Sequence, residues 1–322
     1  MPAAANCNQN VSNSINVTEM YFSRASIGAS SHISTRSPIY STARRRMNGP
    51  GGQTSIRSVM EDPVPKKLHV HPKLNKGYGW KPGLPNMKHP LYNARTEAAA
   101  LPAKVDLRPE CPPVYDQGQL GSCTGNGWAG AVEFLLKKQG LQDFTPSRLF
   151  IYYNERVLEN DVSEDAGASI SDGAHVVSAQ GCPHENLWPY NISAFAEKPP
   201  QNVYQDGLHH LALQVQQVAQ NLTSMKEVLA TGLPIVIGFT VYQSFESDHV
   251  TATGIVPMPG HHEQVLGGHC VVLVGYDDSQ SRFIVRNSWG TGWGLQGYCL
   301  MPYAYLTNPR LASDFWMATH TE

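Results

Sequence analysis

Residues 116–124, DQGQLGSCT, stand directly before the strongest helical pattern in the chain. That pattern runs from about Thr124 to Gln139, with two lysines in its last turn and Gly140 as a stop. Cys123 therefore falls in the first turn of a predicted helix. Free backbone amides and the positive end of the helix dipole stabilise a thiolate there and lower its pKa. An arbitrary cysteine is more often a buried core thiol, but this placement makes Cys123 a candidate nucleophile for acyl carbons.

Four further side chains complete a possible catalytic constellation. Gln117 can place its amide beside the backbone N–H of Cys123, and together these donors would form an oxyanion hole. His269 opens an apolar run, and Asn287, across an expected hairpin, can hydrogen-bond the distal imidazole nitrogen. Trp289 can shield that bond from water at the edge of a substrate site. A nucleophile, a base and an orienting group are the requirements of acyl transfer.

The remaining periodicity places helices first and strands second. Helices are predicted at 146–158, 171–180 and 223–231, the first with Pro146 at its start and the last begun by Thr223. Runs of β-branched and aromatic residues predict strands at 234–242, 269–278 and 282–289. Helices followed by antiparallel strands are typical of an α+β fold.

Three ordered blocks, QGxxGSC, GGHxVxxVGY and RNSWGxxWGxxGY, resemble those of the papain-like, cathepsin-type cysteine peptidases. The resemblance spans roughly residues 104–322. It implies that Cys123 is the nucleophile, His269 the acid/base, Asn287 the group that orients the histidine and Gln117 the oxyanion donor. It also implies a two-lobed α+β fold: a mainly helical left lobe with Cys123, a β-barrel-like right lobe with His269 and Asn287, and a cleft between them.

The same resemblance implies where a peptide substrate lies. Gly167 and Ala168 would hydrogen-bond its extended backbone, Ile170 would line the main specificity pocket, and Gly267 and Gly268 would form the opposite wall. An aliphatic pocket favours apolar or aromatic side chains two residues before the cut, since burying a leucine contributes roughly 1.5–3 kcal/mol.

The cysteines depart from the common family pattern. Leu120 stands where a cysteine is usual, so the common disulfides of the left lobe cannot form, and the chain is similar to the microbial or viral branch. Cys111 and Cys182 could form a replacement bridge if their distance allows it. Cys270 and Cys299, inside strand-like runs, are expected to be core thiols.

The net charge of −2 hides a strong asymmetry. Residues 1–100 carry 13 basic and 4 acidic residues, or +9, whereas residues 101–322 carry 11 and 22, or −11. Residues 1–65 are polar and basic, and are expected to be a disordered or loosely held leader. Charge would hold this leader in part, and protonation of carboxylates below about pH 4–5 would weaken the attraction.

Residues 66–103 are expected to form a pro-segment ahead of a peptidase domain at 104–322. Residues 77–85, GYGWKPGLP, are similar to a block that precedes the peptidase domain in bacterial relatives. The implied protein is a zymogen whose pro-segment lies in or beside the cleft in cis and is cut between Asn93 and Lys104. We expect a monomer that acts on proteins or peptides and needs no cofactor or metal.

The sequence leaves other locations and two alternative functions open. A run of eighteen apolar residues is absent, which excludes a membrane-spanning helix, and no secretory signal is apparent. Cytoplasm, a lysosome-like compartment and a virion all stay open. The alternatives are a catalytically inactive papain-like binding protein and a basic-tailed nucleic-acid-associated protein, the latter suggested by the arginines at 44–46 and otherwise unlikely from the sequence.

The paired histidines favour no metal site in the sequence alone. His209–His210 and His261–His262 are expected to be solvated loop residues. His69 and His71 lack a third ligand nearby in the sequence.

Overall fold

The computed structural model describes residues 77–83, 89–92 and 101–322, all within one compact unit, Pro63–Glu322. The expected leader, 1–65, and the rest of 66–100 lie outside the described residues. The described elements, in chain order, are β1 (Lys104–Asp106), α1 (Cys123–Lys138), α2 (Arg148–Glu159), α3 (Ile170–Ala179), α4 (Gln201–Gly207), β2 (Ala212–Leu213), β3 (Gln216–Gln217), α5 (Leu222–Ala230), β4 (Ile235–Tyr242), α6 (Asp248–Thr253), β5 (Val265–Asp277), β6 (Arg282–Arg286), β7 (Tyr298–Pro302), α7 (Tyr303–Leu306), β8 (Ala312–Met317) and β9 (His320–Thr321).

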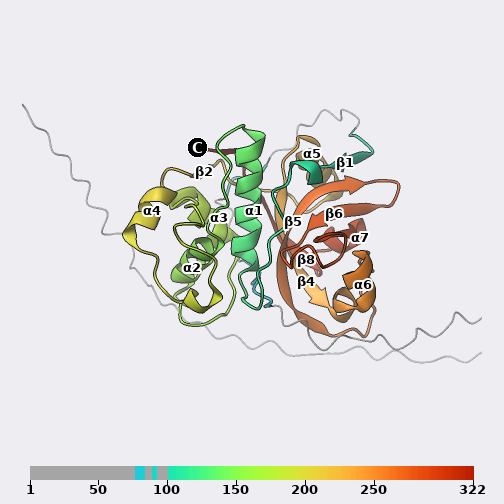
Figure 1. Cartoon of the computed structure of the whole chain (residues 1–322). Coiled ribbons are helices and arrows are strands. Elements are labelled where there is room, and N and C mark those ends of the chain that lie inside the picture. Colours follow the sequence, from blue (N-terminus) through green and yellow to red (C-terminus); the bar gives the residue numbers. More distant parts are fainter. Residues whose placement is uncertain (1–76, 84–88, 93–100) are drawn as a thin grey trace, which may run out of the picture. The chain divides into compact units, whose positions relative to one another are not determined.

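Helix α1 stands between the other large helices and the sheet (Figure 1). It contacts α2 and α3 on one side and β5 on the other. Every residue from Cys123 to Leu136 is buried, which explains why its sequence is rich in alanine and glycine as well as leucine. Small residues let a helix approach neighbours on both sides closely. No described helix is long and apolar enough to cross a membrane.

Two helix starts differ from the sequence prediction because side-chain caps decide them. α2 begins at Arg148 rather than at Pro146, because Ser147 caps it and accepts a hydrogen bond from the backbone N–H of Phe150. Asn221, rather than Thr223, caps α5 through the N–H of Ser224. Both caps have extended backbones, from which the side-chain oxygen can reach the free amides of the first turn.

The sheet has seven strands in the order β3-β8-β4-β5-β6-β7, with β1 also paired to β5. All its neighbouring strands are antiparallel. β5 is longer than predicted, because it begins at Val265 rather than His269. Its pairing with β4 sets His269 opposite Phe239 in the middle of the ladder. β6 ends at Arg286, so Asn287 opens the loop that follows.

Helix and sheet meet where α1 crosses β5. A Cβ atom on Gly127 of α1 would lie 2.9 Å from the sulfur of Cys270 in β5. Only a glycine permits this approach. Because Cys123 begins the same helix and His269 adjoins Cys270, this contact fixes both side chains on one rigid frame.

One sequence expectation about the thiols and one about the histidines are wrong. Cys111 and Cys182 are both free, so the replacement bridge is wrong: the Cys111 thiol is hydrogen-bonded to the Leu107 carbonyl oxygen, 3.4 Å away, while Cys182 is fully buried. Cys270 and Cys299 are buried core thiols, as expected. His210 is not a solvated loop residue either. It is half-buried, with its ring centroid 4.6 Å from that of Phe144.

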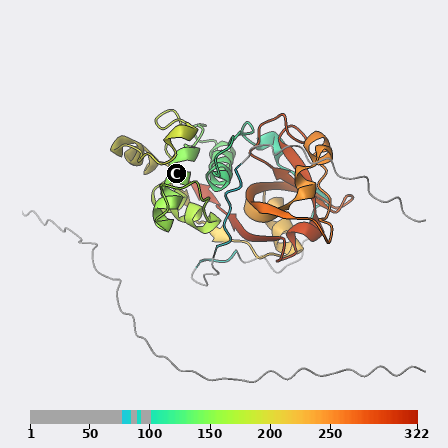
Figure 2. The same ribbon diagram turned by 90° about the horizontal axis from the view of Figure 1, so that it is seen from below.

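The two described pieces ahead of residue 101 each pair with the backbone of a later segment. Trp80 forms a parallel bridge with Ala168, and Leu91 forms one with Gln217 of β3. Figure 2 shows the first piece, residues 77–83, running between the helices and the sheet. The described residues 77–83 and 89–92 are therefore extended, as the mixture of aromatic residues and prolines predicts.

Two positive-φ glycines offer a matched test of the helical part. A Cβ on Gly181 (φ 78°) would lie 1.7 Å from the carbonyl oxygen of Gly207, whereas a Cβ on Gly140 (φ 68°) would meet nothing within 4 Å. Gly140→Ala should cost about 1–2 kcal/mol of unfolding free energy from backbone strain alone. Gly181→Ala should cost at least about 3 kcal/mol, because a clash is added. Urea denaturation measures both; equal losses would contradict the clash.

Candidate active site

Cys123 is the first residue of α1 and is completely buried. Burial raises the pKa of its thiol to about 12, although backbone hydrogen bonds, among them one from Gly79, act in the opposite direction. The sequence expectation of a lowered pKa is therefore wrong for this state of the protein. The helix start is present, but the chain segment lying over it removes the water that a thiolate needs.

His269 lies in β5 and is held by one strong hydrogen bond. Its Nε2 is 2.8 Å from Oδ1 of Asn287, which also accepts the N–H of Ser288. Because an amide oxygen only accepts, Nε2 carries the proton and Nδ1 is left with a lone pair. Nδ1 has no hydrogen-bond partner among the described residues. Burial lowers the pKa of His269 to about 4, against the effect of Asn287.

Trp289 covers the imidazole as the sequence suggested. Its ring stacks on that of His269 at 4.9 Å between centroids, with the planes 29° apart. The indole is almost wholly buried. The hydrogen bond between His269 and Asn287 is therefore shielded from water on that side, and shielding strengthens it.

Gln117 connects the cysteine loop to the loop that carries Asn287. Its Nε2 donates to the carbonyl oxygens of Leu120, at 2.9 Å, and Gly77, at 3.0 Å. Its Oε1 accepts from the hydroxyl of Ser288 at 2.6 Å. Because carbonyl oxygens only accept, the bonds to Leu120 and Gly77 fix which end of the amide is the donor. The donor end thus points at a peptide carbonyl of the segment ahead of the domain.

The two expected walls of the cleft hold an extended peptide, and that peptide is part of this chain. Trp80 donates its backbone N–H to the carbonyl of Gly268 at 3.0 Å. Ala168 donates to the carbonyl of Gly79 at 2.7 Å and accepts from the N–H of Lys81 at 3.0 Å. A Cβ on Gly167 would lie 2.1 Å from the Gly79 oxygen, so a side chain at 167 would displace the segment.

Tyr78 and Gly267 meet at the His269 end of the cleft. A Cβ on Gly267 would lie 2.8 Å from that of Tyr78. The tyrosine ring lies 6.2 Å from the rings of both His269 and Trp289, and its hydroxyl donates to Glu246. Gly267 therefore lies against this tyrosine, beside Gly268.

The indole of Trp80 fills a pocket whose lining differs in part from the expectation. A Cβ on Gly238 would lie 2.0 Å from the indole ring, and one on Gly268 would lie 2.8 Å from it. The indole N–H donates to Oδ2 of Asp314 at 3.0 Å, as does the backbone N–H of Gly83 at 2.8 Å. Ile170 is fully buried at the start of α3, where its carbonyl accepts from Trp128.

Gly238 and Asp314 are the residues that sequence reasoning missed. Gly238 interrupts an apolar strand, and a glycine inside a strand often marks a close approach of another chain. Gly238 could therefore have been identified from the sequence as a place of close approach. Asp314 left none, because its position at the end of the pocket depends on β8 pairing with β4, which no local pattern reveals.

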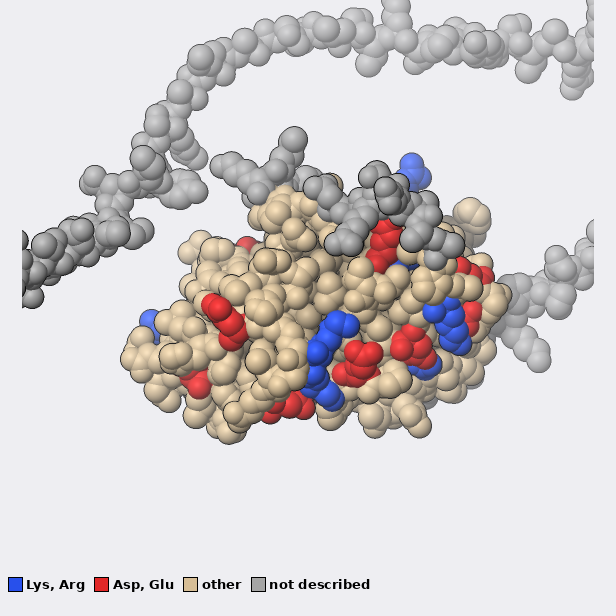
Figure 3. Space-filling model, turned by 90° about the horizontal axis from the view of Figure 1, so that it is seen from above, with Lys and Arg blue, Asp and Glu red and all other residues tan. Residues whose placement is uncertain are grey.

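The face of the described residues drawn in Figure 3 shows no single basic patch. On the face drawn in Figure 3, lysine and arginine side chains stand beside aspartate and glutamate rather than gathering into one basic patch. A nucleic-acid site is expected to show such a patch or stripe.

The comparisons with known proteins agree with this arrangement. Residues 101–313 match the family model described as papain family cysteine protease. An uncharacterised peptidase C1-like protein of Acanthamoeba polyphaga mimivirus is 43% identical over 223 residues, which cover 66% of this chain and 72% of the relative. A cathepsin B-like protein of Giardia intestinalis is 30% identical over 222 residues, covering 62% and 69%.

Solved structures extend the likeness to the fold. Xylellain, a cysteine protease from Xylella fastidiosa, superposes with a TM-score of 0.74 at 38% identity and covers 80% of this chain and 100% of its own. Digestive procathepsin L 3 of Tenebrio molitor, at 20% identity and a TM-score of 0.59, covers 76% of each chain and shares the fold. The α+β, two-lobed architecture is therefore papain-like, and the chain belongs to the papain family of cysteine proteases.

Proposed function

We propose that this protein is a cysteine endopeptidase made as a zymogen, in which Cys123 and His269 cleave peptide bonds and residues 77–83 block the cleft. The observation that carries the proposal is the course of that segment. An extended peptide already lies across Cys123 and bonds to both walls through its backbone. Since the chain continues before Gly77 and after Gly83, the cleft admits a polypeptide at both ends, as an endopeptidase requires.

The chemistry follows from the hydrogen bonds of the site. Nδ1 of His269 takes the thiol proton, and the Cys123 thiolate attacks the substrate carbonyl carbon. The oxyanion is held by Nε2 of Gln117 and the Cys123 backbone N–H. His269 then protonates the leaving amine, which gives a thioester. Water, activated by the same imidazole, releases the acid and restores the thiol, while Asn287 keeps the ring in one tautomer throughout.

The direction of residues 77–83 explains why they would inhibit rather than be cut. The leaving amine takes its proton from His269, so the C-terminal part of a substrate must lie beside His269 and Trp289. In the segment the N-terminal residue Tyr78 lies there, and the chain then runs to Trp80 and Lys81. The segment therefore runs in the chain direction opposite to that of a substrate. The Gly77 carbonyl accepts the hydrogen bond of the Gln117 amide, but in this direction its peptide bond is not oriented for cleavage.

With the segment in place, neither Cys123 nor His269 carries a charge near neutral pH. With the pKa of Cys123 at about 12 and that of His269 at about 4, both groups are neutral between these values. The raised thiol pKa means that thiolate appears only at strongly alkaline pH. The lowered imidazole pKa means that imidazolium appears only in acid. Departure of the segment returns water to both groups and permits the thiolate–imidazolium pair at neutral pH.

The rival functions make different predictions for the thiol. A papain-like binding protein needs no reactive Cys123, and a nucleic-acid-associated protein would use the basic residues 1–100. The buried and oriented donors around Cys123 favour catalysis, because a binding surface has no use for a fixed imidazole tautomer.

Cys123→Ala should abolish peptide hydrolysis, a loss of at least about 10³-fold, since no other group can form the thioester. Cys111→Ala, which removes a half-buried free thiol elsewhere, is the matched control and should stay active. Activity is measured with a fluorogenic peptide after acid incubation, and folding by thermal melting. Wild-type hydrolysis by Cys123→Ala, or an inactive parent whose thiol resists an epoxide-type inhibitor, would refute catalysis by this cysteine.

Trp80→Ala should open the cleft of the uncut protein. Trp80 is 7% exposed, and losing a buried indole costs about 3 kcal/mol or more, or roughly 100-fold in segment binding. Alkylation of Cys123 by iodoacetamide at pH 7 should accelerate accordingly. Leu91→Ala is the control, because Leu91 is 51% exposed in the same pro-region. N-terminal sequencing shows whether the chain has been cut between Asn93 and Lys104, and so distinguishes an open cleft in the uncut protein from proteolysis. An unchanged alkylation rate would contradict the inhibitory role.

The Trp80 pocket indicates a preference at the residue two before the cut. Its glycine walls accept a large side chain, and the Asp314 carboxylate at its end needs a donor once the segment leaves. We expect arginine or lysine to be accepted alongside apolar and aromatic residues, which extends the preference drawn from the sequence. Burial raises the pKa of Asp314, while the N–H groups of Gly83 and Trp80 oppose this effect.

Asp314→Asn should lower kcat/KM for arginine at that position by roughly 10–100-fold relative to leucine, the range for a hydrogen bond to a charged group. Asparagine suits the test because it tolerates the positive φ of 58° and keeps the shape of the side chain. The leucine substrate is the internal control. A ratio that does not change would show that Asp314 does not select the side chain.

A further inference from the structure

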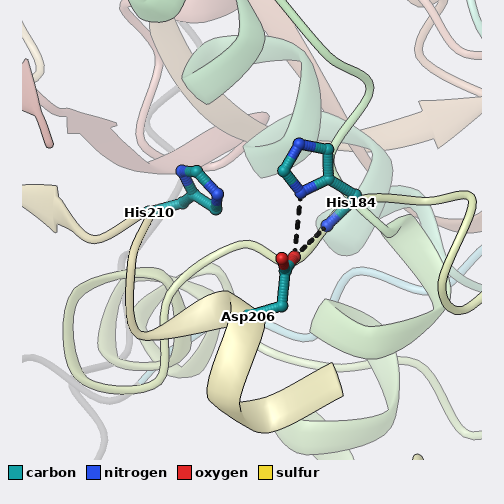
Figure 4. Close-up of side chains that lie close together, drawn as sticks. All are labelled: His184, Asp206 and His210. Carbon is teal, nitrogen blue, oxygen red and sulfur yellow. Dashed lines mark hydrogen bonds and ion pairs between the residues drawn. The ribbon is translucent and has the colours of Figure 1, made fainter. Parts of the chain in front are cut away.

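A cluster of two histidines and one aspartate lies in the helical lobe. His184 follows α3, Asp206 lies in the last turn of α4, and His210 stands in the loop before β2. One nitrogen from each imidazole and one carboxylate oxygen all lie within 4.8 Å of one another. Figure 4 shows the three side chains converging from these separate segments.

We propose that His184, Asp206 and His210 bind one zinc ion or a similar divalent transition-metal ion. Two imidazoles and a carboxylate are a ligand set that zinc prefers, with water as a fourth ligand. Ligands of a tetrahedral zinc ion lie about 3.3 Å apart, as follows from zinc–ligand distances of about 2 Å. Nδ1 of His184 and Oδ2 of Asp206 are already 2.9 Å apart, so the His210 nitrogen is the ligand atom that must move closer.

The surroundings hold the three ligands in place. Oδ2 of Asp206 accepts the backbone N–H of His184 at 2.9 Å and lies 2.9 Å from Nδ1 of the same residue. Metal binding replaces this side-chain contact, and any proton on Nδ1 is released to water. The Phe144 ring stacks on His184 at 3.9 Å and lies 4.6 Å from His210. The backbone carbonyl of His210 accepts the N–H of Cys182 at 3.0 Å. The backbones and one aromatic wall therefore hold the three ligand atoms within 4.8 Å of one another, and the proposed ion requires the His210 nitrogen to move toward the other two.

The ligand types suit a cation. An aspartate carboxylate and histidine imidazole nitrogens are donors that divalent transition-metal ions accept in proteins.

Water can reach the site. His184 and Asp206 side chains are 25% and 23% exposed. A cavity of about 400 Å³, lined in part by Phe144, Thr145 and His184, opens beside them. The position is distinct from the cleft, and a bound ion would tie the end of α4 to the chain that follows α3. We therefore assign the metal a structural role in the helical lobe.

The test uses the full-length chain with Cys123→Ala, which removes the reactive thiol as a competing ligand. Cobalt(II) is titrated as a visible-absorbing substitute for zinc, and zinc affinity is measured by displacement. One equivalent should bind with the absorption of a tetrahedral nitrogen–oxygen site, and zinc should raise the melting temperature in a way that EDTA reverses.

Three substitutions in that background locate the ion. His210→Ala and Asp206→Asn should each weaken binding by at least about 10-fold, the lower bound for changes around bound metals. His209→Ala, at the exposed neighbouring histidine, should bind like the parent. Melting without metal shows whether each variant is folded, and Asp206→Asn keeps the acceptor if His210→Ala is unstable. The proposal is overturned if the parent binds no cobalt, or if both variants bind as tightly as the parent.

Discussion

The contact between Gly127 of α1 and Cys270 of β5 is the constraint on which the site depends. A helix that starts in one lobe and a strand that belongs to the other meet there, and the helix contributes no side chain at the point of contact with the Cys270 sulfur. Cys123 and His269 each sit a short distance along the chain from this crossing. Their relative position is thereby set by the packing of two rigid elements rather than by loops, and packed elements hold reacting groups with the accuracy that catalysis needs.

Burial has two opposite effects on such a site. It strengthens the bond between His269 and Asn287, because Trp289 keeps water away from it. It also removes the hydration that charged forms of Cys123 and His269 require, which is why both are neutral under the segment. The same dry environment can therefore serve an orienting bond and suppress an ion pair. Which effect governs reactivity depends on whether residues 77–83 are in place.

The sequence predicted what local chemistry encodes. The helix after Cys123, the strands around His269 and the spacing to Asn287 all followed from periodicity and motif, and helix starts were missed by one or two residues where Ser147 and Asn221 cap. What failed depended on distant packing. Asp314 reaches its pocket through strand pairing. Cys111 and Cys182 are both free, so the expected bridge is absent, and the ring of His210 packs against Phe144, which is distant in the sequence.

The described residues ahead of residue 101, which we propose to be part of a pro-region, contact the rest of the protein at two separate places: the cleft through residues 77–83 and the edge of β3 through residues 89–92. Both lie upstream of the expected cut. Cleavage would therefore not expel the inhibitor but turn one chain into two, joined by a bivalent non-covalent contact. Breaking either attachment leaves the other to hold the peptide close, at a high effective concentration. Activation would then be timed by dissociation of both contacts rather than by the cut itself.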